Sequence, residues 1–180
     1  MELKDLQKPL PITSIDFRIQ SINKGGYATI LAYKDARVDM KRLDEVCTAL
    51  NWKRQHLNNN ANCIVSIYDE KKKEWVSKED TGTESNTEAS KGLASDSFKR
   101  ACFNWGIGRE LYDYPLIRCK LNKDEWEPNG QKAKSTWNLK LKEWVWCSEF
   151  SEDGTVTYLA AKAVQGGKWV TRFTYGKRKE

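Results

Sequence analysis

The sequence predicts an α+β fold, in which an antiparallel β-meander packs on a long central helix and an antiparallel β extension follows at the C-terminal end. Three observations predict it. Short segments that alternate apolar and polar residues come before residue 80, one segment of helical period follows, and alternation returns from residue 139. With 180 residues, the chain is long enough for one domain and a substantial extension. We expect the core domain over residues 1–118 and the extension, packed on or beside it, over residues 119–180.

The N-terminal strands are marked by period-two alternation and by the turn residues between them. Asn23-Lys24-Gly25-Gly26 is typical of a tight turn, and Asn58-Asn59-Asn60 and the charged segment 69–73 predict two more. Between the first two of these turns, the apolar spacing changes to a helical period. The expected order is therefore strands at 14–21 and 27–33, a helix at 37–50, and a meander of strands at 52–57, 62–68 and 74–78.

The central helix is the best-marked element. Ser85 and Glu88 have the spacing of a capping box, in which each side chain accepts a hydrogen bond from a backbone amide at the start of the helix. We expect the helix to run to about Trp105 and to end at Gly106. One face of this helix is expected to lie on the sheet and gathers Ala94, Phe98, Ala101, Cys102 and Trp105. The opposite face of the helix is also partly apolar, which indicates a second packing partner, either a neighbouring subunit or the chain's own C-terminal region.

The region after residue 115 begins with a polar stretch, 122–135, whose composition predicts a turn at Pro128-Asn129-Gly130 and is compatible with mobility. From residue 139 onward, alternating segments predict a three-stranded antiparallel meander. The chain ends in Lys177-Arg178-Lys179, which we interpret as a solvated end or, alternatively, as an extra phosphate contact.

The charge is moderately basic and unevenly spread. The chain carries 31 Lys and Arg against 25 Asp and Glu, a net charge of +6. Residues 1–60 and 115–180 are both basic, whereas residues 61–114 carry 8 basic against 10 acidic side chains. Because a basic field attracts polyanions, this charge is compatible with nucleic-acid binding, but it does not predict it alone.

Several classes of protein are disfavoured by the remaining composition. Five cysteines without a CxxC pair indicate reduced, mostly buried thiols rather than a metal site. His56 is the single histidine, and we expect it to be structural because it lies in a predicted strand. We find no Walker-type nucleotide motif, no apolar membrane span and no signal peptide. We therefore expect a cytoplasmic protein that does not associate with membranes.

The segment from residue 94 to residue 112 resembles a known family. Its Lys99-Arg100-Ala101 step, followed by the aromatic-Gly stop Trp105-Gly106, is similar to the signature helix of the Rad52/Sak superfamily of single-strand DNA annealing proteins. That superfamily includes small phage recombinases. The resemblance covers roughly residues 12–115. Weaker matches fall in the family's order at the 23–26 turn, at Asn51-Trp52 and at Asp80-Thr81-Gly82.

The resemblance implies which side chains hold DNA. In the family, the Lys and Arg of the signature step line a groove that binds the phosphodiester backbone and leaves the bases exposed. This assigns Lys99 and Arg100 here, with pairing to a carboxylate such as Asp96 as the alternative. Cations fixed on a rigid helix neutralise phosphates and make binding salt-dependent. The further candidates are Lys24, Lys53, Arg54 and Arg109 for DNA binding, and Tyr27, Tyr33 and Trp52 for base stacking.

These further candidates have structural alternatives. Lys53 and Arg54 are adjacent on a predicted strand, so at most one of them faces the groove. Arg109 either contacts phosphate or caps the last carbonyl groups of the helix. The aromatic residues either stack on bases or pack in the core.

The implied function is ATP-independent binding of single-stranded DNA and annealing of complementary strands in homologous recombination and DNA repair. The resemblance also implies a homo-oligomeric ring of about eleven subunits. A single-strand-binding protein is a further expected partner, and a bacterial host cytoplasm is the expected location if the chain is phage-encoded. Annealing requires no covalent chemistry, so we assign no catalytic residue, no cofactor and no metal.

Two other classes of function stay open from the residues alone. Asp80, Glu84 and Glu88, with Lys91 nearby, are the residue types of a metal-dependent nuclease acting on DNA, although Glu88 is better explained as a helix cap. The second alternative is a non-catalytic structural oligomer or protein-interaction module.

Overall fold

The computed structural model describes residues 2–83 and 89–178, and it confirms the α+β class with antiparallel sheets. The chain forms two compact units. The first consists of Met1–Leu10 and Lys34–Arg109, and the second consists of Pro11–Tyr33 and Glu110–Glu180. The predicted domain boundary at residue 118 stays a prediction, because the compactness of a unit does not show that the unit folds on its own.

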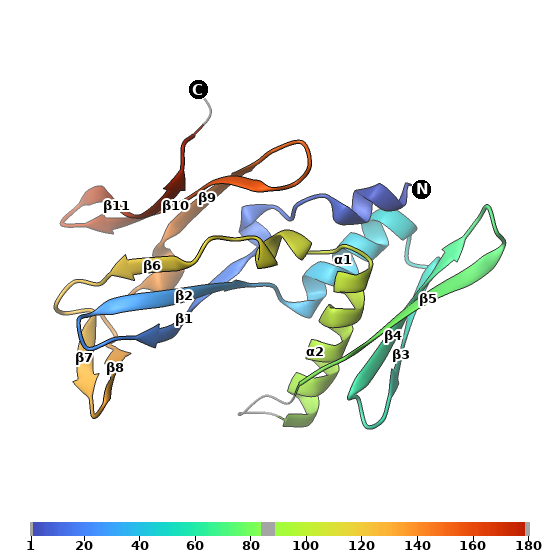
Figure 1. Cartoon of the computed structure of the whole chain (residues 1–180), viewed down its shortest axis with the longest axis horizontal. Coiled ribbons are helices and arrows are strands. Elements are labelled where there is room, and N and C mark those ends of the chain that lie inside the picture. The colour runs from blue at the N-terminus through green and yellow to red at the C-terminus, as the bar shows by residue number, and fades with distance from the viewer. Residues whose placement is uncertain (1, 84–88, 179–180) are drawn as a thin grey trace. The chain divides into compact units, whose positions relative to one another are not determined.

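The first unit is a three-stranded sheet with the long helix on one face, as Figure 1 shows. The strands pair in the order β3-β4-β5 and are antiparallel. Asp35 caps the first helix by accepting a hydrogen bond from the Arg37 amide at 2.8 Å. The elements are η1 (Leu3–Gln7), α1 (Ala36–Cys47), β3 (Trp52–Leu57), β4 (Asn62–Asp69), β5 (Glu74–Thr81) and α2 (Ala89–Asn104).

The sheet-facing side of α2 is the one that the helical period predicts. Phe98, Ala101, Cys102 and Trp105 are all buried, whereas Ala94 is only half-buried. Alternate residues of β4 complete this core, and the Trp105 indole donates to the Val65 carbonyl at 3.0 Å. A buried Trp with its N–H satisfied contributes both apolar area and a fixed orientation, so α2 is held rigidly on the sheet.

The C-terminal end of α2 follows the predicted glycine stop. The helix ends at Asn104, and Gly106 has φ +97°, a left-handed conformation that suits glycine. The Ile107 amide then donates back to the Cys102 carbonyl at 3.2 Å. The predicted capping box at Ser85 and Glu88 lies outside the described residues.

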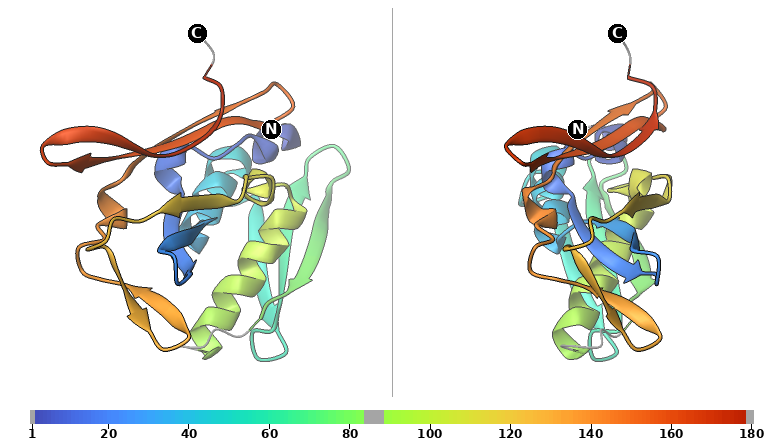
Figure 2. Two further views of the ribbon diagram at one scale, coloured as in Figure 1. Left: turned by 60° about the vertical axis from the view of Figure 1, so that its left-hand side comes forward. Right: turned by 90° about the vertical axis from the view of Figure 1, so that its left-hand side faces the viewer.

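The second unit contains two antiparallel sheets, one of five strands in the order β6-β2-β1-β8-β7 and one of three strands in the order β11-β10-β9. Figure 2 shows the β10–β11 hairpin, orange to red, from two directions. The strands are β1 (Asp16–Ile22), β2 (Tyr27–Tyr33), β6 (Ile117–Lys120), β7 (Trp126–Asn129), β8 (Lys132–Ser135), β9 (Val145–Phe150), β10 (Val156–Gln165) and β11 (Lys168–Gly176). Short 3-10 helices occur at η2 (Ile12–Ser14), η3 (Arg109–Tyr112) and η4 (Leu141–Glu143).

One apolar cluster joins the two sheets of the second unit. Ile22, Ala28 and Ile30 of the five-stranded sheet belong to the same buried cluster as Leu159 and Ala161 of β10. The ring of Phe17 also stacks on Trp146, with centroids 3.7 Å apart and an interplanar angle of 4°. Each sheet therefore has one buried face and one outer face.

The structure differs from the sequence predictions in three places. The polar stretch 122–135 contains the β7–β8 hairpin, whose strands were not predicted, and of the predicted turn residues only Gly130 lies between the two strands. The short strand β6 was not predicted. The first helix ends at Cys47 rather than residue 50, because Thr48 leaves the helical conformation with φ 63°. The predicted three-stranded C-terminal meander is confirmed by β9, β10 and β11. Among the described residues, no helix is long and apolar enough to span a bilayer.

Gly82 tests the close packing between the end of β5 and α2. A Cβ at Gly82 would lie 2.6 Å from the Ser97 amide nitrogen and 2.9 Å from the Leu93 carbonyl oxygen, and neither backbone atom can move cheaply. We expect Gly82→Ala to lower the free energy of unfolding by about 1–3 kcal/mol, as overpacking does, measured by urea denaturation. Gly25→Ala is the control, because Gly25 is exposed and its nearest neighbour is a side-chain atom. Equal stability of the two variants would contradict this packing.

Candidate nucleic-acid interface

The outer face of the five-stranded sheet brings aromatic and cationic side chains together. Alternation along β2 buries Ala28 and Ile30, so Tyr27 and Tyr33 point to the opposite face. Cross-strand register adds cations to that face, since Tyr27 pairs with Lys120, Thr29 with Arg118, and Leu31 with Arg18. We call this surface the tyrosine face, formed by Arg18, Tyr27, Tyr33, Arg118 and Lys120.

Three cations of the tyrosine face lie over its two rings. The Lys120 Nζ is 4.7 Å and the Arg118 Cζ 5.2 Å from the Tyr27 ring centroid, and the Arg18 Cζ is 5.2 Å from that of Tyr33. Lys120 also donates to the Gly25 carbonyl. The tyrosines remain 44% and 37% exposed. Aromatic rings and guanidinium planes both stack on bases, and the same cations neutralise phosphates.

Three members of the tyrosine face, Arg18, Arg118 and Lys120, were not predicted as site residues. The signal for two of them is visible in Ile117-Arg118-Cys119-Lys120, where apolar and basic residues alternate and the basic ones must share a face once the segment is a strand. Lys24, which was predicted, lies in the β1–β2 turn and donates to the Gln131 side chain at 3.1 Å. It therefore has a partner on the chain.

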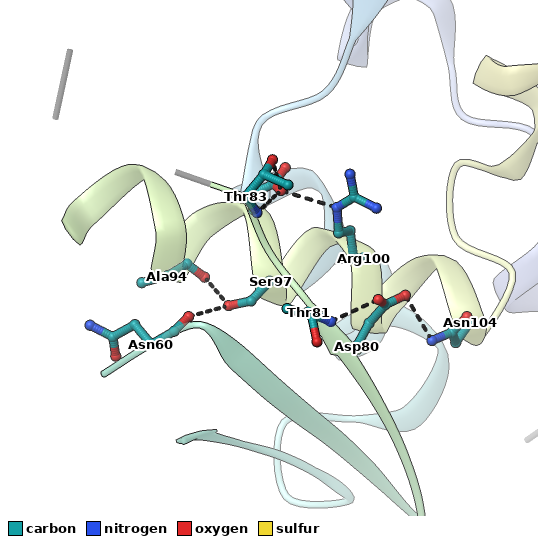
Figure 3. Close-up of polar contacts among 9 residues, drawn as sticks. Asn60, Asp80, Thr81, Thr83, Ala94, Ser97, Arg100 and Asn104 are labelled. Carbon is teal, nitrogen blue, oxygen red and sulfur yellow. Dashed lines mark hydrogen bonds and ion pairs between the residues drawn. The ribbon is translucent and has the colours of Figure 1, made fainter. Parts of the chain in front are cut away.

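On α2, Arg100 adopts the ion pair that was the alternative to phosphate binding. Its Nε donates to the Asp96 carboxylate at 3.1 Å, while that carboxylate also accepts from the Thr83 amide at 2.9 Å (Figure 3). The Arg100 side chain is nevertheless 42% exposed. Because solvent reaches both side chains of this half-buried pair and screens it, a phosphate can compete for the guanidinium.

Lys99 lies in the field of acidic groups around the start of α1. Hydrogen bonds from Arg37 lower the pKa of Asp35, and the charge of Lys99 adds to that effect. Burial raises the pKa of Asp39 to about 6, against the opposing charges of Lys34 and Lys99. Lys34 donates to Asp39 in this buried pair. The positive charge of Lys99 is therefore partly balanced by nearby carboxylates.

The β3 candidates separate onto the two faces of their sheet. The Lys53 Nζ is 4.2 Å from the Trp75 ring centroid, whereas the Arg54 Cζ is 4.9 Å from that of Phe98 on α2. The two side chains therefore lie on opposite faces of the sheet, and the expectation that at most one of them faces a DNA groove stays a prediction. Trp52 has the contacts of a packing residue, with its ring 6.2 Å from Phe98 and its indole donating to Asp44 at 2.7 Å.

Arg109 makes helix-capping contacts, which is one of the two roles that the sequence suggested for this residue. Its Nε donates to the Phe103 carbonyl at 2.9 Å, and its Nη2 donates to the Asn104 carbonyl at 3.0 Å. These are two of the last carbonyl groups of α2, which have no partner within the helix. Arg109 therefore stabilises the end of the helix in this structure.

Of the three carboxylate residues in the nuclease alternative, only Asp80 lies among the described residues. Its side chain accepts from the Thr81 amide at 2.7 Å and from the Asn104 side chain at 3.1 Å (Figure 3). Glu84 and Glu88 lie outside the described residues. Within the described residues, no three His, Cys, Asp or Glu side chains gather in a metal-binding group. His56 lies 3.5 Å from the buried Ser97 hydroxyl, which is compatible with a structural role.

Comparison with known proteins places this chain among DNA repair proteins. A model of the Rad52/22 family of double-strand break repair proteins matches residues 2–129. The chain is 33% identical over 122 residues to the single-stranded DNA-binding protein DdrA of Deinococcus radiodurans, covering 64% of this chain and 58% of that protein. It is 31% identical over 144 residues to DdrA of Deinococcus deserti, covering 76% of this chain and 71% of that protein.

The extent of these matches is limited in two ways. The aligned part spans less than two thirds of the length of the Deinococcus radiodurans protein. The family model ends before β8, so it includes neither that strand nor the β9–β11 sheet. No solved structure matches the chain significantly.

Proposed function

The chain belongs to the Rad52/22 family of double-strand break repair proteins, and from that premise we propose that it binds single-stranded DNA and anneals complementary strands without ATP in recombination and repair. The family membership confirms the resemblance carried by the signature at residues 94–112. Two relatives named as single-stranded DNA-binding proteins support the choice of ligand. The tyrosine face is the observation that carries the proposal.

The tyrosine face has the chemistry that an extended single strand requires. Bases stack on Tyr27 and Tyr33 or on the guanidinium planes beside them, and the cations neutralise the adjacent phosphates. Stacking does not discriminate among bases, because every base has a π-face. Binding through this face is therefore independent of sequence and weakens as the salt concentration rises.

Lys99 and Arg100 provide a second group of phosphate contacts, on the first unit. A phosphate takes the place of Asp96 at Arg100, since the existing pair is partly exposed and weak. Because α2 is packed on its sheet through Phe98 and Trp105, these cations are presented on a rigid support. Contacts to the backbone rather than to base edges leave the bases free to pair with a complementary strand.

Annealing requires several weak contacts to act on one strand at the same time. A homo-oligomeric ring multiplies the contacts of each subunit, because each further binding event on the same strand is intramolecular. We therefore propose that the active form is a closed ring and that no nucleotide hydrolysis is needed. A single-strand-binding protein is a proposed partner, since it occupies the same DNA.

The tyrosine face can be tested by substituting both rings. We expect Tyr27→Ala/Tyr33→Ala to weaken binding of a labelled oligothymidylate by about 1–3 kcal/mol for each base that loses its stacking partner, measured by fluorescence anisotropy. Tyr27→Phe/Tyr33→Phe retains both rings and should bind as wild type. Tyr112→Ala removes an exposed tyrosine outside this sheet and is the matched control. Unchanged binding by the double alanine variant would remove the tyrosine face from the proposal.

Annealing is tested by mixing complementary labelled strands without ATP and following pairing by energy transfer. We expect the wild type to accelerate pairing, and Lys99→Ala/Arg100→Ala to be slower, with a smaller dependence of binding on salt because two phosphate contacts are lost. Arg37→Ala/Lys41→Ala removes two exposed cations of α1 and is the control.

Two results would contradict the annealing proposal. The first is a spontaneous pairing rate that the wild-type protein leaves unchanged. The second is shortening of the strands in Mg²⁺ or Mn²⁺ that Asp80→Ala abolishes, which would support the nuclease alternative instead.

A further inference from the structure

The five-stranded sheet continues past the tyrosine face to the β7–β8 hairpin. Ile22 of β1 pairs with Ala133 of β8, and both side chains pack on the apolar side of the sheet. Because neighbouring residues of a strand point to opposite faces, Lys132 and Lys134 point to the side that bears Tyr27. Both lysines are exposed. The sheet therefore adds two cations to this side, on a strand that lies outside the family match.

Two contacts hold the hairpin beside the β1–β2 turn. A Cβ at Gly26 would lie 2.4 Å from atoms of the Trp126 ring, so this indole of β7 packs directly on the backbone of the turn. The Lys24 Nζ of the turn also donates to the side chain of Gln131 between the two hairpin strands, at 3.1 Å. These contacts and the pairing of β1 with β8 place Lys24 and Lys132 close to the tyrosine face.

The cations of the hairpin and of the turn differ in their partners. Lys134 pairs with Glu127, which lies opposite it on β7, at 3.0 Å. Among the described residues, neither Lys24 nor Lys132 has a carboxylate partner. An ammonium group has three N–H donors, so Lys24 retains donors beyond the one that Gln131 uses. An anion can therefore bind to Lys24 and Lys132 without displacing an acidic side chain.

The free edge of the hairpin is unsuited to pairing with a strand of another protein. β7 is the outermost strand on its side of the sheet, and its Pro128 has no backbone N–H to donate. The preceding residue, Glu127, is charged. Proline and charged residues are features that prevent strand addition at an edge. The hairpin therefore favours a ligand that contacts the face of the sheet through side chains.

The spacing of the strands suits one strand of nucleic acid. β2, which bears Tyr27, and β8 are two positions apart in the sheet order, so about 10 Å separates them at ~4.8 Å per step. This distance corresponds to about three phosphates at ~3.4 Å each along one strand of DNA. A strand whose base stacks on Tyr27 therefore reaches Lys132 within a few nucleotides.

From this arrangement we infer that the path of single-stranded DNA extends from the tyrosine face across β1 to the β7–β8 hairpin, where Lys24 and Lys132 bind phosphates of the strand whose base stacks on Tyr27. The inference rests on the proposed function and deepens it, because it gives the direction of the strand across the sheet and assigns a phosphate site at the hairpin. Contacts to phosphates leave the bases over the hairpin free to pair with a complementary strand.

The test measures binding of a labelled oligothymidylate to the full chain by fluorescence anisotropy over a salt series. We expect Lys24→Ala/Lys132→Ala to reduce the slope of log K against log salt by about 1.4, because two phosphate contacts are lost at ~0.7 each. Lys24→Arg/Lys132→Arg keeps both charges and should retain the wild-type slope.

The matched control is Lys162→Ala/Lys168→Ala, which removes two exposed lysines from the other sheet of the same unit. This variant changes the net charge by the same amount and should retain the wild-type slope. Thermal unfolding checks that each variant is folded. An equal reduction of the slope in the two alanine variants would overturn the inference, because the loss would then follow net charge rather than position.

The failure of this inference can be distinguished from that of the proposed function. Wild-type protein that does not bind the oligothymidylate would overturn both. Binding that is weakened by Tyr27→Ala/Tyr33→Ala but keeps its full slope in Lys24→Ala/Lys132→Ala would overturn this inference alone. A slope that falls in Lys24→Ala/Lys132→Ala and stays unchanged in the matched control would support the path across the hairpin.

Discussion

Alternation along β2 is the constraint on which the proposed site depends. Ala28 and Ile30 are buried in the core of the second unit, and burial of an isoleucine side chain contributes about 1.5–3 kcal/mol. Because successive residues of a strand point to opposite faces, the same register must expose Tyr27 and Tyr33. A slip of one residue would exchange the two faces. The core therefore determines where the tyrosine face lies, and pairing with β1 and β6 determines which cations stand over its rings.

The two groups of cations differ in how they are held. On the tyrosine face, Arg18, Arg118 and Lys120 lie over aromatic rings, an interaction of about 0.5–1 kcal/mol at exposed sites that does not cancel the charge. On α2, Arg100 is paired with Asp96, and the charge of Lys99 is partly balanced by nearby carboxylates. Phosphate binding at Arg100 therefore begins with the displacement of a carboxylate, whereas on the tyrosine face Lys120 exchanges only its hydrogen bond to the Gly25 carbonyl. This difference is a reason to expect the stronger electrostatic contribution from the sheet.

The sequence predicts the elements whose signals are local. The strand bounds at 27–33 and 52–57 and the helix end near Gly106 agree with the structure, because turn residues and a glycine stop mark them directly. The pairing of Arg100 with Asp96 is also local, since residues four apart share a helix face. Arg118 and Lys120 were missed because they become site residues only when the four-residue β6 pairs with β2, about ninety positions earlier in the chain. The β7–β8 hairpin was missed because its strands are short and polar.

Photo-cross-linking maps the contact between protein and DNA most directly. Oligothymidylate carrying iododeoxyuridine is bound to the full chain, irradiated and digested, and the attached peptides are identified by mass spectrometry. If bases stack on the tyrosine face, cross-links will appear on peptides that contain Tyr27 and Tyr33, and unlabelled single strands will suppress them by competition. Cross-links found only on peptides outside β1, β2 and β6, from protein that is saturated with DNA, would contradict the account.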